Sequence, residues 1–144
     1  MAVATLLNLQ ITTAVTAAVS PALAAIESPP SGVLLEAIFS YGSGGTSADA
    51  WVQTSVDGGA TWIDVANFHF TTSSASALFN LSAATPITTQ YTPTDGTLAA
   101  NTAKDGIIGP IWRIKYTTVG TYAGGTSLKV CASVPGSNRF VGIP

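Results

Sequence analysis

Apolar and polar residues alternate along several short segments of this chain, which is the pattern of β-strands with one buried face. The clearest case is residues 111–118, IWRIKYTT, which place Trp112, Ile114 and Tyr116 on one face and the intervening cations on the other. Residues 128–134 alternate in the same way. No segment repeats its apolar residues at the helical period. The pattern therefore predicts an all-β chain.

Nine short segments carry the strand pattern, and turn-forming Gly, Pro, Asp and Ser residues separate them. They are residues 7–12, 14–26, 33–41, 48–56, 61–70, 74–81, 87–91, 111–118 and 128–134. The segment 33–41, VLLEAIFSY, is apolar on both faces except at Glu36 and Ser40, which predicts a central strand covered on both sides. Short strands with regular turn signals are typical of sandwiches and barrels. We expect an antiparallel β-sandwich, jelly-roll-like, with about nine short strands.

The length of 144 residues fits a single domain. We divide the chain into an N-terminal arm or first strands (1–30), a β-sandwich core (31–134) and a C-terminal coil (135–144). Within the core, residues 92–110 hold two Asp-Gly pairs and are predicted to form a long loop. Loops of this length are usually functional or disordered.

Residues 3–26 contain no charge, and the sequence ALA at 22–24 matches a signal-peptidase site. A secretory signal, however, has a basic start and an unbroken apolar core, whereas Asn8, Gln10 and several threonines interrupt this stretch. Pro21 and the threonines also break the run before it reaches the ~18 apolar residues of a membrane span. We therefore expect an ordered arm or first strand, and no membrane partner.

Charged residues make up only 8% of the chain, while 47% of its residues are hydrophobic. A free monomer normally keeps its solubility with interspersed charges, so this composition favours a surface that is covered in an oligomer or a larger particle. The alternative is a neutral, hydroxyl-rich surface that remains in contact with water. The five basic residues do not cluster, and the net charge is −2, so nucleic acid is not expected as a partner.

Residues 55–62, SVDGGATW, resemble the Asp box, a hairpin motif of sialidases and related β-propellers. The matching positions are Ser55, Asp57, Gly58, Gly59, Thr61 and Trp62. The resemblance implies a turn in which the aspartate accepts backbone hydrogen bonds and the glycines take positive φ. One copy in 144 residues is too little for a propeller of ~40 residues per blade, and a sialidase arginine cluster is missing. The motif therefore predicts a structural hairpin without catalytic chemistry.

The residue types that carry most enzyme chemistry are scarce. His69 is the only histidine and lies between two phenylalanines, which predicts an ordinary strand residue on the face opposite to them. Cys131 is the only cysteine, so no internal disulfide forms, and it has only Lys129 nearby to activate a thiolate. We expect both side chains to be inert, and we predict no catalytic residue.

Most carboxylates lie in predicted turns, where Asp is a routine turn former, so we expect no catalytic carboxylate pair. Glu36 is the exception, and we expect it to pair with Arg113 or Lys115 rather than to be buried alone. Asp95 and Asp105 lack the ligand run of a calcium loop. We therefore predict no metal site and no cofactor.

Two binding surfaces are conceivable from the sequence. Trp51, Trp62 and Tyr122 lie near predicted loops, where they form either an aromatic platform for sugars or part of the core. The three cations on the last two strands are predicted to share an outward face, which is expected to be solvated, with contact to an acidic partner as the alternative. They are Arg113, Lys115 and Lys129.

Taken together, the Met-initiated, Thr/Ala-rich first strand and residues 33–68 and 91–130 resemble small virion proteins of tailed bacteriophages, over most of residues 5–134. The resemblance implies a non-enzymatic β-sandwich in the virion, most often a capsid decoration or cement protein that binds the major capsid protein as a homo-oligomer. A tail or neck component is the first alternative, with tail proteins as partners. A carbohydrate-binding module of a phage fibre is the second.

Overall fold

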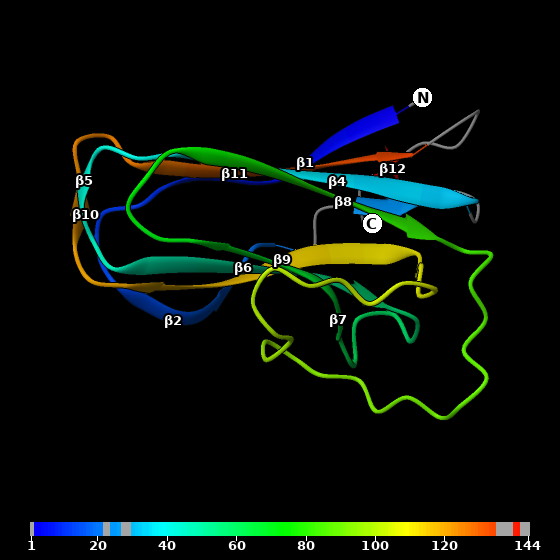
Figure 1. The fold of residues 1–144 in the computed structure, drawn as a ribbon. Coiled ribbons are helices and arrows are strands. Elements are labelled where there is room, and N and C mark those ends of the chain that lie inside the picture. Colours follow the sequence, from blue (N-terminus) through cyan, green and yellow to red (C-terminus); the bar gives the residue numbers. More distant parts are fainter. Residues whose placement is uncertain (1, 22–23, 27–29, 135–139, 142–144) are drawn as a thin grey trace.

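Two antiparallel β-sheets pack face to face in the computed structural model, which describes residues 2–21, 24–26, 30–134 and 140–141 (Figure 1). The described part of the chain contains no helix. The prediction of an all-β antiparallel sandwich is therefore confirmed. In chain order the strands are β1 (Ala2–Gln10), β2 (Val15–Val19), β3 (Ala24–Ile26), β4 (Gly32–Ser40), β5 (Ser43–Gly44), β6 (Ser47–Ser55), β7 (Ile63–Phe70), β8 (Ala75–Ser82), β9 (Ile111–Val119), β10 (Tyr122–Ala123), β11 (Ser127–Val134) and β12 (Phe140–Val141).

One layer is a four-stranded sheet in the order β1-β11-β4-β8. The other layer follows the order β12-β3-β9-β6-β7, and β2 pairs with β9 beside this path. In the four-stranded sheet, the first strand β1 pairs with β11 from near the other end of the chain. Strand β4 pairs with β11 on one side and with β8 on the other. The hairpin of β6 and β7 is the predicted one, and its register pairs Ala48 with Phe70 at the open end.

The core consists of alternate residues of both sheets, as the period-2 pattern predicts. From β4, Leu35 and Phe39 point inward at 0% and 1% exposure, and from β9 Trp112 and Ile114 do the same at 0%. The inward positions of β11 are buried as well. Each such side chain contributes about 1.5–3 kcal/mol by leaving water, so the alternating faces supply the main stabilisation of the sandwich.

A cluster of aromatic side chains fills the end of the sandwich where β5 and β10 form a two-stranded ribbon. The ring of Phe39 stacks on Phe70 at 5.1 Å, and the ring of Tyr122 meets Phe39 edge-on at 5.9 Å. Two similar sequences, YGSGGTS from Tyr41 and YAGGTS from Tyr122, lie side by side here. A side chain at Gly42 would collide with the Ala123 and Gly124 carbonyls, so glycine is required for this close approach.

Two expectations about segments need correction. Residues 87–91 form no strand, so the loop runs from 83 to 110 instead of starting at 92. Residues 2–10, expected as an arm or first strand, form strand β1, with Leu6 fully buried. The expected C-terminal coil contains β12, which pairs with β3, and the remaining residues of 135–144 lie outside the described part of the chain.

Candidate interaction surface

The Asp-box hairpin has the geometry that its sequence predicts. Asp57 accepts hydrogen bonds from the Thr61 backbone at 2.9 Å and the Thr61 hydroxyl at 2.6 Å, and from the Ser55 hydroxyl at 2.8 Å. Gly58 and Gly59 have φ of 76° and 94°, which other residues adopt only at a cost. These bonds, with the Thr61 hydroxyl first, lower the pKa of Asp57 from 3.8 to about 2. The motif is therefore a turn that holds β6 and β7 together.

We expect Asp57→Ala to lower the urea midpoint of unfolding at neutral pH, because the turn loses the carboxylate that organises it. The folded pKa of about 2 lies below the ordinary 3.8, so this stabilisation is present above about pH 4 and is lost as the pH falls through about 2. The midpoint difference between wild type and variant should shrink over that range. Val56→Ala, a neighbouring exposed change, should show no such pH dependence, and a constant Asp57→Ala effect down to pH 2 would contradict the assignment.

The predicted cationic face does not exist, because the three cations belong to different sheets. Arg113 and Lys115 lie on β9 in the larger sheet, whereas Lys129 lies on β11 in the four-stranded sheet. Arg113 bonds Gln53 through Nε at 2.7 Å, and its guanidinium lies 4.2 Å from the Trp62 ring centroid. The Lys115 ammonium lies 3.0 Å from an Asp95 carboxylate oxygen. Two of the three cations are thus engaged within the chain.

The loop 83–110 is fastened to the larger sheet by a buried carboxylate that the sequence did not single out. Asp64 on β7 is 0% exposed and accepts hydrogen bonds at 2.7–3.1 Å. The donors are Gln53 Nε2, Thr94 Oγ1 and the backbone N–H groups of Gly96, Thr97 and Leu98. The loop backbone also bonds the free edge of β7, where Asn67 N–H meets the Thr102 carbonyl at 2.8 Å. The long loop is therefore part of the folded domain.

Asp95, within this loop, neutralises the cations on β9. Burial opposes ionisation most strongly, but hydrogen bonds from Gln53 and Lys115 and the charges of Lys115 and Arg113 together hold the pKa of Asp95 below its ordinary value. Asp105 instead accepts a hydrogen bond from the Ser82 N–H at 2.6 Å, and this bond lowers the pKa of Asp105. Neither residue approaches the other acids as a calcium loop requires, and the described residues contain no group of three or more potential metal ligands.

The candidate catalytic residues lie apart. His69 faces away from the core, as predicted, and its Nδ1 is 2.8 Å from Asp49 Oδ1 on β6. Cys131 lies on β11 in the other sheet, where its thiol is 3.9 Å from the Thr5 hydroxyl. The two side chains therefore belong to opposite layers of the sandwich and form no nucleophile–base pair.

The three aromatic residues proposed as a sugar platform also separate. Tyr122 is 1% exposed and belongs to the core, with its hydroxyl bonded to the Thr71 carbonyl at 2.7 Å. Trp51 donates its indole N–H to the Leu98 carbonyl at 3.0 Å under the long loop. Trp62 is covered by Arg113. No shared platform results from these three rings.

The outer face of the four-stranded sheet is open to solvent and carries exposed apolar side chains between polar ones, which the sequence prediction missed. We define this outer face by the outward-pointing residues of β1, β11, β4 and β8. Its exposed apolar members are Val3, Leu34, Ile38 and Leu78, at 67%, 46%, 36% and 59% exposure. The expectation that β4 is covered on both sides is wrong, since its burial alternates strictly. The signal for a half-exposed strand was Glu36 and Ser40 on one face of the period-2 pattern.

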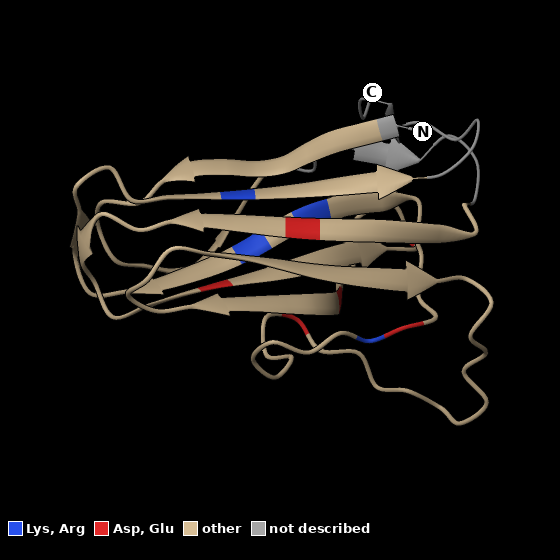
Figure 2. Ribbon diagram, turned by 45° about the horizontal axis from the view of Figure 1, so that its top comes forward, with Lys and Arg blue, Asp and Glu red and all other residues tan. Residues whose placement is uncertain are grey.

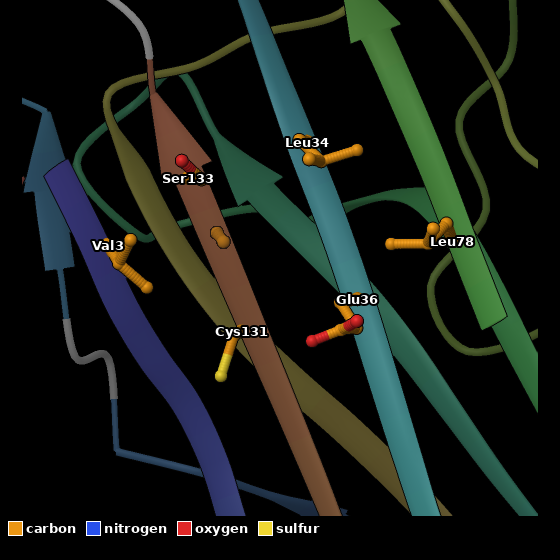
Figure 3. A pocket seen from close by; sticks show the side chains of 7 residues that line it. Val3, Leu34, Glu36, Leu78, Cys131 and Ser133 are labelled. Carbon is orange, nitrogen blue, oxygen red and sulfur yellow. The ribbon is translucent and has the colours of Figure 1, made fainter. Parts of the chain in front are cut away.

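A shallow depression of about 190 Å³ lies on this outer face (Figure 3). Short side chains form its floor, because Cys131 and Ser133 on β11 leave a gap between larger neighbours. The apolar side chains of Val3, Leu34 and Leu78 surround it from the other three strands. The buried Ser133 hydroxyl has no hydrogen-bond partner among the described residues.

Charge on the outer face is limited to one acid and one base. Figure 2 shows them as single coloured segments on β4 and β11, which are Glu36 and Lys129. The register pairs Glu36 with Cys131 and Leu78, so the predicted pairing of Glu36 with Arg113 or Lys115 is wrong. Neither Glu36 nor Lys129 forms a salt bridge with a described residue.

Comparisons with known proteins identified no similar protein. No family model matches the chain, and neither the curated proteins nor the solved structures contain a match. Among the described residues, no helix is long and apolar enough to span a membrane.

Proposed function

We propose that this chain is a non-enzymatic structural protein of a tailed-bacteriophage virion, and specifically a capsid decoration protein that binds the major capsid protein as a homo-oligomer. The class rests on the resemblance of residues 33–68 and 91–130 to small virion proteins. The outer face of the four-stranded sheet is the observation that supports an assembly role. An antiparallel sheet that faces water normally presents polar side chains there, whereas this face also exposes Leu34, Ile38 and Leu78.

The outer face is suited to binding another protein surface. Its outward positions hold Val3, Leu34 and Leu78 around a depression, and only Glu36 and Lys129 are charged. Cores of protein interfaces are depleted in charge and large exposed apolar patches mark interaction sites. A regular sheet is also rigid, so little ordering entropy is lost when it docks.

A four-stranded sheet of this length presents a face of roughly 500 Å², from ~4.8 Å between strands and ~3.3 Å per residue. This is less than the roughly 800 Å² per partner of a standard interface. A single copy should therefore bind the shell weakly. Several linked copies bind a repeating lattice far more tightly than one copy does, which is the reason that an oligomer suits a decoration role.

The geometry around the candidate catalytic residues supports the non-enzymatic part of the proposal. His69 is oriented by Asp49 on the larger sheet, while Cys131 lies on the outer face of the other sheet. The acids that might act in pairs are engaged in hydrogen bonds that fasten turns and the long loop. His69 and these acids thus each take part in a hydrogen bond that holds the fold together.

Co-sedimentation of the purified protein with empty phage heads and, separately, with tails tests the proposal. We expect saturable binding to heads, and we expect Leu34→Lys to weaken it roughly tenfold or more, because a charge then replaces an apolar side chain beside the depression of the outer face. Val56→Lys is the matched control, since Val56 is 65% exposed on the β6–β7 turn, away from the outer face.

Each outcome of this experiment is informative. Binding to tails alone would replace decoration by a tail or neck role. Binding to neither particle would reject the virion assignment. Equal loss with Leu34→Lys and Val56→Lys would mean that the outer face is not the contact surface.

A further inference from the structure

The edges of the two sheets differ in how their free backbone groups are protected. The free edge of β7 is covered by the long loop, through bonds from Asp64 N–H to the Thr94 carbonyl and from Lys104 N–H to the Val65 carbonyl. Pairing of β1 is broken by a register shift after Thr5, and pairing of β2 by another after Val15. Covers and bulges of this kind are the usual means by which proteins prevent strand addition.

Strand β8 is the edge of the four-stranded sheet and has none of these protections. It pairs with β4 from Ala75 to Ser82 without a register shift. Its sequence, ASALFNLS, contains no charge and no proline. Apart from Ser82, whose N–H bonds Asp105, none of its backbone groups bonds a described residue other than those of β4. An uncharged, regular edge strand is a template for another strand.

The core is also incompletely closed along this edge. The inward residues Ala77 and Phe79 of β8 are only half-buried, whereas their partners Ala37 and Leu35 on β4 are 0% exposed. On the outward side, Leu78 is 59% exposed. A strand added to β8 would therefore bury apolar surface on both faces, in addition to satisfying the backbone groups of the edge.

We propose that β8 pairs antiparallel with β8 of a second copy of this chain, about a two-fold axis at Leu78, and so forms a continuous eight-stranded sheet. This inference identifies a contact for the homo-oligomer of the proposed function, and it concerns the edge of the sheet rather than its outer face. The second copy is the occupant because the strand is complementary to itself in this register.

The register brings matched residues together on each face of the joined sheet. Leu78 meets Leu78 of the second copy, and Ser76 meets Asn80, so an apolar pair is flanked by two polar pairs on the outer side. On the inner side Ala77 meets Phe79, a small residue opposite a large one. A charged residue near the axis would face its own copy, and β8 has none.

Joining the edges would also change the outer face. Two faces of roughly 500 Å² would become one surface of about twice that area. This larger area exceeds the roughly 800 Å² per partner of a standard interface, which a single copy does not reach. Dimerisation through β8 thus supplies the surface that binding to a shell requires.

Sedimentation velocity of the full chain over a wide concentration range tests this contact. We expect a dimer for wild type, and we expect Leu78→Lys to raise its dissociation constant roughly tenfold or more, because two ammonium groups then meet at the axis. Leu34→Lys is the matched control, since it adds the same charge to the same outer face but on β4, and it should leave the dimer intact. Circular dichroism checks that both variants fold.

Mixing two variants distinguishes a direct contact from an indirect effect. Leu78→Lys and Leu78→Glu should each be monomeric alone and should form a dimer when mixed, because opposite charges then meet. A monomeric wild type at all concentrations, a dimer that survives Leu78→Lys, or a dimer that Leu34→Lys disrupts equally would overturn the proposal. Failure to restore the dimer by mixing would also overturn it.

The two proposals fail in different experiments. If the wild-type protein forms the dimer but does not bind phage heads, the decoration role is rejected and the β8 contact is supported. If the protein binds heads saturably but stays monomeric in solution and on the shell, the decoration role is supported and the β8 contact is rejected.

Discussion

Replacing Asp64 by alanine is expected to lower the free energy of unfolding by about 3–5 kcal/mol, the range for loss of a buried, multiply bonded charged group. The carboxylate is 0% exposed and collects hydrogen bonds from one amide side chain, one hydroxyl and three backbone N–H groups. Alanine leaves these donors buried without an acceptor. Chemical denaturation by urea measures the effect.

The same substitution should also release the loop 83–110. Lys104 is the only Lys or Arg of this segment, so trypsin reports on the loop at one bond. In wild type the loop backbone is held at this point by the bond from Lys104 N–H to the Val65 carbonyl at 2.8 Å. We expect cleavage after Lys104 to be faster in Asp64→Ala, because cleavage requires local opening.

Asp95→Ala is the control for this prediction, since it removes an acid of the same loop whose side chain is 52% exposed. Its effect should stay near ~1 kcal/mol or less, as for other solvent-exposed ion pairs. Similar losses for Asp64→Ala and Asp95→Ala would show that burial and the number of donors do not decide the stability of the loop.

Phe39→Ala is expected to cost about 3–5 kcal/mol, the range for removing a buried aromatic side chain. Phe39 belongs to β4 of one sheet, yet its ring stacks on Phe70 of β7 in the other sheet at 5.1 Å and an interplanar angle of 5°. Tyr122 approaches it edge-on from β10. The alanine variant therefore leaves a cavity at the point where both sheets and the end ribbon meet.

Phe39→Leu should cost much less, about 1.5 kcal/mol or less, because leucine keeps most of the apolar volume. Comparing the two unfolding curves separates loss of volume from loss of the ring stack. If leucine destabilises the protein as much as alanine does, the specific stacking geometry, rather than filled space, holds this end closed.

The hairpin and the strand faces could be predicted because their signals are local. The Asp-box bonds join residues within four positions of one another, such as Asp57 and Thr61. Alternation along 111–118 assigned Trp112 and Ile114 to the core, and both are 0% exposed. These features depend on steric preferences and periodicity within a few residues.

The errors concern features that depend on distant partners. Residues 87–91 alternate like a strand, but the free edge of β7 is bonded instead by the loop around residues 94–104. The expected cationic face failed because β9 and β11 belong to different sheets. Strand propensity does not specify which edge a segment will pair with, because the hydrogen-bonding groups of every strand are the same.

The sequence by itself determined an all-β antiparallel fold with one buried face per strand, since period-2 strands need a facing sheet or a closed barrel to cover that face. The tertiary structure alone decided what lies on the outside. Asp64 became the anchor of a loop about thirty residues further along the chain, and β4 exposed Leu34 because no described element covers the outer face of the four-stranded sheet. Both results follow from long-range pairing, in which residues far apart in sequence select each other only once the sheets have formed.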